Sequence, residues 1–482
     1  MAESLKERTA KGLFWGTLNS STTQVLNLAM GIVLARLLSP EDYGLVGVLT
    51  IFSAIAAMLQ SSGLGTGLIN LKRPTDNDYN AVFWFNVIVS ILLYGLLFVC
   101  APLIANFFHQ PRLIVLSRVL FLTLPLSALS NASGVYLQKN MMNREIAIVG
   151  IISLILSGIT AVVMASQGYS YWSLVGQQFT FAIAILIGRS LYVKWKPSFN
   201  IDFTPVKLMF GFCVKLLITN IVNVVNFHVL TFIFGRFLPI QTVGYYSQAN
   251  KWNNMAKTTI ADAVGQVAQP VLVSVTDESD REWRVFRKMV RFTALLSFPA
   301  LFGLALVAHE FIVIAIGEKW LESIPLLRII CIGGAFMPFY TLYQNLSISH
   351  GRSDIYMWCN IGQMLAQIAL VLLLYQYGII TVVSGCTLLT IIWLGVWQMA
   401  VGYRTIKLKL IELLKDIVPF MLISLTVMGV TYLATSRISN LYLLLITRII
   451  IAAVLYVIAL KITHAKVMEE CIMFIKMKLN KS

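Results

Sequence analysis

The chain has 482 residues, of which 58% are hydrophobic and only 12% are charged. Soluble globular proteins carry about twice that charged fraction, and the mean hydropathy of this chain is +0.79. The composition therefore excludes a soluble globular domain and predicts a protein that crosses a membrane several times. The net charge of +16 would suit a nucleic-acid surface, but no soluble basic stretch could form one, so we expect no nucleic-acid partner.

The N-terminal stretch MAESLKERTAKGLFWG is basic and lacks the apolar core and cleavage site of a secretory signal peptide. We therefore expect it to be retained, with residues 2–12 as a helix in the membrane interface. The C-terminal stretch HAKVMEECIMFIKMKLNKS has apolar side chains on one side and lysines on the other, which predicts a second interfacial helix.

Long continuous apolar runs follow one another between these ends, such as AVFWFNVIVSILLYGLLFVCAPL at 81–103. Each is long enough to cross ~30 Å of hydrocarbon as a helix. Because the runs do not alternate between polar and apolar residues, they favour helices over barrel strands. The sequence predicts an all-α polytopic membrane protein with about fourteen spans, at 13–36, 44–70, 81–103, 113–138, 146–167, 171–193, 208–235, 244–275, 288–316, 324–349, 354–377, 379–402, 416–435 and 441–463.

Lysine and arginine are unevenly distributed over the loops between these spans. With both termini on one side, 26 of the 37 basic residues lie on that side, 5 lie on the opposite side and 6 fall within spans. Because basic residues concentrate in cytoplasmic loops, we expect both termini to be cytoplasmic. The loops are too short to hold a soluble catalytic domain.

The stretch ARLLSPEDYG at 35–44 has a partial copy, GRFLPIQTVG, at 235–244. The copies share an arginine, a leucine and the final glycines, Gly44 and Gly244, at an offset of 200 residues. Weaker matches continue at similar offsets, so spans 1–6 and 7–12 are predicted to be parallel repeats related by an axis along the membrane normal. We expect an N-lobe (1–200), a C-lobe (201–403), and an appendix (404–482) of two spans and the C-terminal amphipathic helix.

The motif LLSPEDYG is predicted to be a short outer turn between the first two helices of a lobe. Pro40 would end the first helix, and Glu41 and Asp42 would favour the positive N-terminus of the second. We expect both carboxylates to be solvated turn residues. The glycines of SSGLGTGLIN at 61–70 fall inside a span, where they indicate a local bend or close packing, not a nucleotide-binding loop.

The opening KGLFWGTLNSSTTQVLNLAMGIVLARLLSPEDYGLVGV resembles the polysaccharide-export flippases of the multidrug/oligosaccharidyl-lipid/polysaccharide (MOP) transporter superfamily. YLQKNMMNREIA after the fourth span and GYSYWSLVGQQ before the sixth resemble the same family. The resemblance covers essentially the whole chain and looks closest to Wzx-type, colanic-acid-like lipopolysaccharide biosynthesis exporters. It supplies no catalytic motif to transfer to residues of this chain.

This resemblance implies a bacterial inner-membrane protein with a cavity between two six-helix lobes. Its substrate would be an undecaprenyl-diphosphate-linked glycan, moved from the cytoplasmic to the periplasmic leaflet. A polysaccharide polymerase is a candidate partner, beside the surrounding membrane lipids.

A diphosphate at membrane depth needs cationic donors, and sugar hydroxyls need amides and hydroxyls. The first helix of each predicted lobe offers such groups, most of them on one helical face. We expect them to line the cavity, with hydrogen bonding between helices of one lobe as the alternative. They are Ser20 and Thr23 in the first span, and Lys215, Asn220 and Asn223 in the seventh.

The eighth span, GYYSQANKWNNMAKTTIADAVGQVAQP, is the most polar of the fourteen. Lys251 and Lys257 are predicted to contact the anionic headgroup, with Asn250 and Asn254 beside them. The alternative for each lysine is that it snorkels to the interface. Asp262 would neutralise a lysine or carry a coupling proton or sodium ion.

Other ionisable residues within spans have less defined roles. Arg118 and Arg328 occupy equivalent positions in spans 4 and 10, where we expect a structural role or a cavity charge. Arg448 is expected to snorkel, and Glu310 is a second candidate for ion coupling. The six cysteines show no metal-ligand spacing, so we expect neither a metal nor a cofactor.

Two other functions are open to a chain of this class. A cation-coupled exporter of small organic cations belongs to the same superfamily, although lysines outnumber acids in spans 1, 7 and 8. A membrane glycosyltransferase or polymerase using the same lipid carrier would need a large outer loop with catalytic side chains. Since the outer loops are short, the chain is predicted not to be an enzyme.

Overall fold

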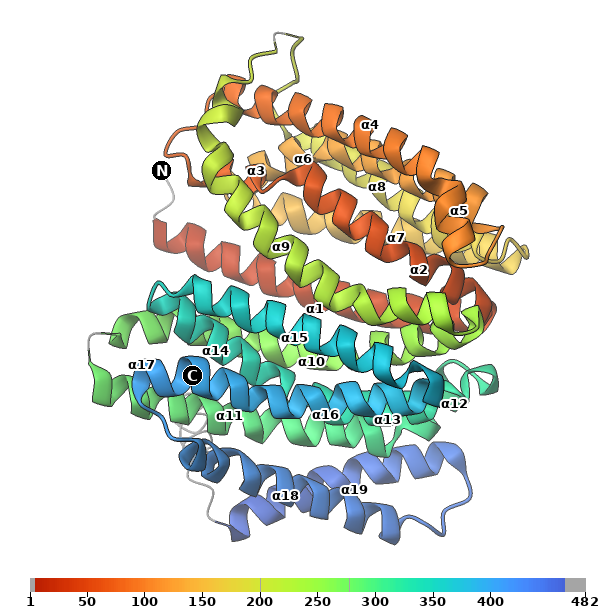
Figure 1. Cartoon of the computed structure of the whole chain (residues 1–482), viewed down its shortest axis with the longest axis vertical. Coiled ribbons are helices and arrows are strands. Elements are labelled where there is room, and N and C mark those ends of the chain that lie inside the picture. Colours follow the sequence, from red (N-terminus) through yellow and green to blue (C-terminus); the bar gives the residue numbers. More distant parts are fainter. Residues whose placement is uncertain (1–4, 200, 277, 464–482) are drawn as a thin grey trace. The chain divides into compact units, whose positions relative to one another are not determined.

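The computed structural model describes residues 5–199, 201–276 and 278–463, without the side chains of residues 5–14, 17, 212, 215, 216, 219 and 353. Throughout this described part, every regular element is a helix (Figure 1). The prediction of an all-α fold is therefore confirmed. The predicted C-terminal interfacial helix lies outside the described residues.

The chain divides into two units, with Gly244 as the last residue of the first. In the first unit α7 and α8 pack along each other, α1 lies against α7, and α9 lies against α2 and α4. Its helices are α1 (Leu5–Leu37), α2 (Pro40–Ser61), α3 (Leu64–Asn70), α4 (Asp76–Phe107), α5 (Leu113–Phe121), α6 (Thr123–Lys139), α7 (Asn143–Ser166), α8 (Trp172–Tyr192), α9 (Thr204–Phe237) and the start of α10 (Ile240–Val275).

The second unit holds the rest of α10 and the remaining helices. In this unit α11 packs against α18 and α13, and α18 lies beside α19, as the blue helices of Figure 1 show. Its elements are α11 (Ser279–Leu306), α12 (Ala308–Ala315), η1 (Glu318–Trp320), α13 (Ser323–Gly334), α14 (Met337–Ser349), α15 (Ser353–Leu374), η2 (Tyr375–Tyr377), α16 (Ile379–Trp397), η3 (Gln398–Tyr403), α17 (Arg404–Ile406), α18 (Leu410–Ala434) and α19 (Leu441–Ile462).

Within the described residues, eleven helical segments are long and apolar enough to cross a membrane. Predicted spans 1, 7 and 8 correspond to α1, α9 and α10, which are continuous helices of 33, 34 and 36 residues but are not among the eleven. The predicted helices thus exist at all fourteen positions, whereas the count of fourteen membrane spans stays a prediction. The interfacial position of residues 2–12 also stays a prediction. Residues 5–12 are the first part of the continuous helix α1.

Several predicted spans are interrupted helices. The second span breaks between α2 and α3, where Ser62 and Gly63 have left-handed backbone angles (φ 46° and 70°). The predicted local bend at the glycine cluster is therefore confirmed, because a left-handed residue ends a helix and glycine adopts that conformation without strain. The tenth span likewise divides into α13 and α14.

The turn at LLSPEDYG differs in two ways from the prediction. Pro40 does not end a helix: α1 ends at Leu37, and Pro40 is the first residue of α2, where its missing N–H leaves no hydrogen bond unmade. Asp42 is buried, not solvated. Its carboxylate accepts hydrogen bonds from the Ser39 backbone N–H at 2.8 Å and from the Ser170 hydroxyl, and so completes the cap of α2.

Two ion pairs attach the appended helices α18 and α19 to the rest of the second unit. Arg287 of α11 donates twice to Asp416 of α18, at 2.6 and 3.0 Å. Arg448 of α19 donates to Glu310 of α12 at 2.6 Å. Arg448 is 5% exposed, so the expectation that it snorkels to the interface was wrong. A buried partner satisfies its charge where water is excluded.

Candidate substrate-binding site

The helix α10 carries the largest group of predicted site residues. One face of this helix is buried within the second unit, where Trp252 meets the Phe311 ring with centroids 5.2 Å apart. Asn253 packs so closely on Gly334 that a Cβ at that glycine would have no room. The buried positions recur every three or four residues within each of two groups, as on a helix that uses one stripe for packing. The groups are Tyr246, Ala249 and Asn253, and then Val264, Ala268 and Leu272.

The neighbouring face of α10 holds the predicted headgroup ligands. Asn250, Lys251, Asn254 and Lys257 are all half-buried. The two lysines are separated by ~9 Å along the helix axis, from the 1.5 Å rise per residue. Between them, the Asn254 side-chain oxygen is buried and accepts no hydrogen bond within the described part of the chain. The structure thus brings two cationic groups and an available amide together on one helix.

Asp262 lies further along α10 and is exposed. It forms no ion pair among the described residues, so its predicted pairing with a lysine of α10 is not seen. Its role as a coupling residue stays a prediction.

The polar residues of α1 and α9 lie in the first unit. Ser20 and Asn220 are exposed, whereas Thr23 and Asn223 are half-buried. On α1, the side-chain oxygen of Asn19 faces Gly150 of α7, so this part of the helix packs within its own unit. The side chain of Lys215 lies outside the described residues. The cavity-lining role of these residues remains a prediction.

The two arginines at equivalent positions of the predicted repeat have different surroundings. Arg118 of α5 lies over the ring of Phe98, with its Cζ atom 4.3 Å from the ring centroid. Its Nε atom is buried without a hydrogen-bond partner in the described residues. Arg328 of α13 is exposed. The contact with Phe98 favours a structural role for Arg118, as one of the two predicted alternatives.

Sequence reasoning missed an apolar groove in the second unit. The groove has a volume of about 730 Å³ and lies between α11 and α19, with Met428 of α18 and Ala256 of α10 in its wall. Ala256 directly precedes Lys257, so the groove reaches the lysine-bearing segment of α10. Arg448, which is already paired with Glu310, is its one charged lining residue. Apolar residues in membrane helices gave no signal that could separate a groove from lipid-facing surface.

Helices of this length and hydropathy, together with lysines and amides half-buried on α10, define a polytopic membrane protein with a candidate anion site. A family model described as polysaccharide biosynthesis protein matches residues 33–325. The chain belongs to this family, which confirms the predicted membership of the polysaccharide-export group.

Named relatives resemble the chain over most of its length. The teichuronic acid biosynthesis protein TuaB of Bacillus subtilis (strain 168) is 25% identical over 392 residues, which are 81% of this chain and 80% of TuaB. The succinoglycan biosynthesis transport protein ExoT of Rhizobium meliloti (strain 1021) is 25% identical and covers 82% of this chain and 79% of its own length. The lipopolysaccharide biosynthesis protein WzxC of Escherichia coli (strain K12) is 25% identical, covering 73% of this chain and 72% of WzxC.

Solved structures agree in fold. The lipid II flippase MurJ, in an inward closed conformation, superposes with a TM-score of 0.77 at 18% identity, covering 94% of this chain and all of MurJ. An inward-facing multidrug resistance transporter of the MATE family gives a TM-score of 0.60 at 15% identity, covering 79% of this chain and 94% of that structure. At such low identity these likenesses show the fold alone.

Proposed function

We propose that this chain is a flippase that moves a polyprenyl-diphosphate-linked oligosaccharide from the cytoplasmic to the outer leaflet of the bacterial inner membrane. The observation that carries the proposal is the half-buried pair Lys251 and Lys257 on α10, in a member of a polysaccharide biosynthesis family. Charged groups at membrane depth are costly and are retained where they bind or conduct a substrate. Two lysines six residues apart, or about 1.7 helical turns, can each donate to a phosphate of the headgroup.

The groove between α11 and α19 suits the other end of the same substrate. Its walls are almost entirely apolar, as an isoprenoid chain requires. Ala256 of α10 lines the groove, so the groove reaches the helix that carries the two lysines proposed to bind the diphosphate. Sugars would be held by the amides of Asn250 and Asn254.

Transport would proceed by alternating access, in which the two lobes of the repeat rock about the bound substrate. Both termini would lie in the cytoplasm, in keeping with the charge distribution. Asp262 is the candidate residue for coupling to a proton or sodium gradient. A polysaccharide polymerase that consumes the flipped glycan is the expected partner. The relative ExoT is named a transport protein, which supports the reading that the chain itself is not an enzyme.

The test is a flip assay with the purified full chain in liposomes that contain a fluorescent polyprenyl-diphosphate oligosaccharide. Protein-dependent protection of the label from an external quencher would report transport. Lys257→Ala should lower the rate about tenfold or more, because a hydrogen bond to a charged group is worth ~1.5–3 kcal/mol. Lys461→Ala, at an exposed lysine near the end of α19, is the matched control. Wild-type rates from the Lys257 variant would refute the assignment.

Export of small organic cations is the second candidate, because the MATE transporter shares the fold and Asp262 offers an exposed carboxylate on α10. A binding site with two lysines would repel such substrates. Uptake of an organic cation that Asp262→Asn abolishes, with no movement of the lipid-linked glycan under any ion gradient, would establish the exporter instead.

A further inference from the structure

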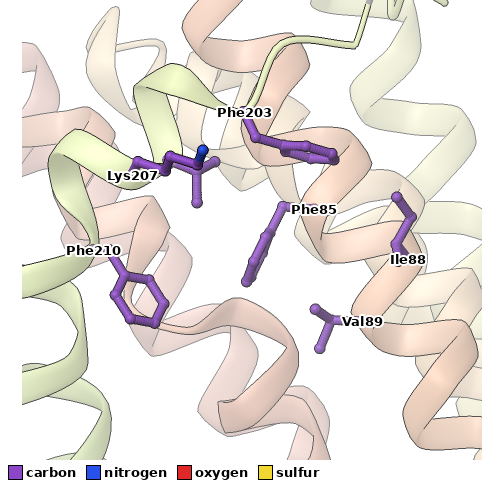
Figure 2. Close-up of a pocket in the computed structure, with 7 residues that line it drawn as sticks. Phe85, Ile88, Val89, Phe203, Lys207 and Phe210 are labelled. Atoms are coloured by element: carbon purple, nitrogen blue, oxygen red, sulfur yellow. The ribbon is translucent and has the colours of Figure 1, made fainter.

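A second cavity lies in the first unit and is lined by none of the residues assigned above to the substrate. Its volume is about 500 Å³, and its walls come from α4 and α9. Figure 2 shows Phe85 in the middle, Ile88 and Val89 of α4 on one side, and Lys207 and Phe210 of α9 on the other. Phe203 closes the remaining wall.

The lining combines an apolar interior with one cation. Apart from Lys207, none of the described lining side chains has a hydrogen-bonding group, so these side chains offer nothing to a sugar. Lys207 is exposed, and its ammonium has no hydrogen-bond or ion-pair partner within the described part of the chain. The cavity therefore suits a ligand with a long apolar chain and an anionic end.

Asp202, just before α9, is an acidic group that interacts electrostatically with Lys207. Hydrogen bonds from Thr204 and then from Asn77 lower the pKa of Asp202, so the carboxylate is ionised at neutral pH. The Thr204 backbone N–H donates to one carboxylate oxygen at 2.9 Å and the Asn77 amide to the other at 3.0 Å. Lys207 is the smallest of the influences that lower this pKa and forms no ion pair with Asp202 among the described residues, so its ammonium can still pair with an external anion.

Aromatic contacts place the cavity near the membrane surface. The Trp84 indole donates to the Ser198 carbonyl at 2.7 Å and packs against Phe199, with ring centroids 5.5 Å apart. A tryptophan whose indole N–H has a polar partner while its ring packs on apolar groups is typical of the membrane–water interface. The adjoining loop contains two further lysines, Lys194 and Lys196, which the charge distribution assigns to the cytoplasmic side.

We propose that this cavity binds one acyl chain of an anionic phospholipid of the cytoplasmic leaflet, whose phosphate pairs with Lys207. A phospholipid carries its phosphate close to the start of its chains, which matches a cation at the edge of an apolar cavity. A diphosphate-linked glycan would call for several cationic and polar groups, and only one is present among the described lining residues. The lipid would contact both α4 and α9 and so hold these helices together.

Equilibrium binding to the delipidated full-length protein in detergent, counted by native mass spectrometry, tests the proposal. The probes are phosphatidylglycerol, phosphatidylcholine with the same acyl chains, and a polyprenyl diphosphate. We expect one tightly bound phosphatidylglycerol and weaker binding of phosphatidylcholine. Lys207→Glu should weaken phosphatidylglycerol binding roughly tenfold, because it replaces attraction at one site by repulsion.

Two further variants separate the cavity from general surface attraction. Ile88→Trp places a large ring at an exposed lining position and should remove the tight site for phosphatidylglycerol while sparing the fold. Lys194→Glu makes the same charge change on the adjoining loop and should leave the tight site intact. Three results would each overturn the proposal. Lys194→Glu could weaken phosphatidylglycerol binding as much as Lys207→Glu does, Ile88→Trp could leave this binding unchanged, or the site could prefer polyprenyl diphosphate.

Discussion

Gly44 and Gly244, which stand 200 residues apart in the two copies of the turn motif, make reciprocal contacts with each other's segment. Gly44 packs on the backbone carbonyl of Ile240, and Gly244 packs on the backbone carbonyl of Pro40. Pro40 and Ile240 are equivalent positions in the repeat. Each copy of the motif thus contacts the other through the same two positions, which is the pattern that a two-fold axis produces. The close backbone contact explains why both copies have a glycine at this position.

Neither glycine has room for a Cβ atom, because the obstructing atoms belong to the backbone. Gly44→Ala should therefore reduce the free energy of unfolding by ~1–3 kcal/mol, the usual range for overpacking. Thermal unfolding of the purified protein in detergent would measure this change. Gly95→Ala in α4 is the matched control, since a Cβ there meets nothing within 4 Å, and a helical Ala is intrinsically favoured over Gly. Equal melting temperatures for the two variants would contradict the close contact.

The buried pair of Arg448 and Glu310 should behave as one unit in a double-mutant cycle. Arg448 also donates to the Thr435 hydroxyl at 3.2 Å and the Leu306 carbonyl at 3.3 Å. Arg448→Met leaves the buried Glu310 carboxylate without its arginine, and removing one partner of a buried pair costs ~3–5 kcal/mol. Adding Glu310→Gln should recover part of that loss. Additive losses in thermal unfolding would show that the two side chains are not coupled.

Asp42 and Asp78 perform the same capping role in different surroundings. Each accepts from the backbone N–H and hydroxyl of its N-cap residue, Ser39 or Thr75. Asp42 is buried and also accepts from the Ser170 hydroxyl, whereas the Asp78 cap is exposed.

We therefore expect Asp78→Ala to cost about 1 kcal/mol, a typical capping contribution, and Asp42→Ala to cost more, because it leaves the Ser170 hydroxyl without its acceptor. Thermal unfolding of the two variants side by side would measure the difference. A smaller loss for Asp42→Ala would mean that its burial adds nothing to the cap.

The groove between α11 and α19 can be blocked without altering the packed core. Ala453 is exposed and lines the groove, whereas its exposed neighbour Val454 does not. Ala453→Trp should reduce glycan flipping severalfold, because the ring occupies space assigned to the lipid chain. Val454→Trp should leave flipping unchanged in the same liposome assay, and both proteins should unfold at the same temperature. Equal flipping rates would remove the groove from the proposed pathway.

The positions of the helices follow closely from the sequence. Apolar runs must be helical in a membrane, because no water is present to satisfy an unpaired backbone group. Hydropathy alone therefore located α4, α7, α16 and α19 within a few residues. The same rule cannot detect a break such as Ser62–Gly63, since a left-handed residue changes the helix direction without changing its hydropathy.

The candidate site was predictable only in part. The polarity of α10 identified Lys251, Lys257 and Asn254 as unusual, because local composition is readable along one helix. The burial of Asp42 was not predictable, since it depends on Ser170, 128 residues away. The groove beside Ala256 was equally hidden, because residues of four helices, α10 and α11 with the distant α18 and α19, form it.

The sequence by itself determined an all-helical membrane protein and the segment richest in polar groups, since each of these depends on residue type and order alone. Tertiary structure decided which charges are buried and with what partner. Arg448 was expected to extend to the membrane interface. Its ion pair with Glu310, 138 residues earlier in the chain, stabilises it in a buried position instead. A buried charge is tolerated only where folding supplies its counter-charge, and that pairing exists only in three dimensions.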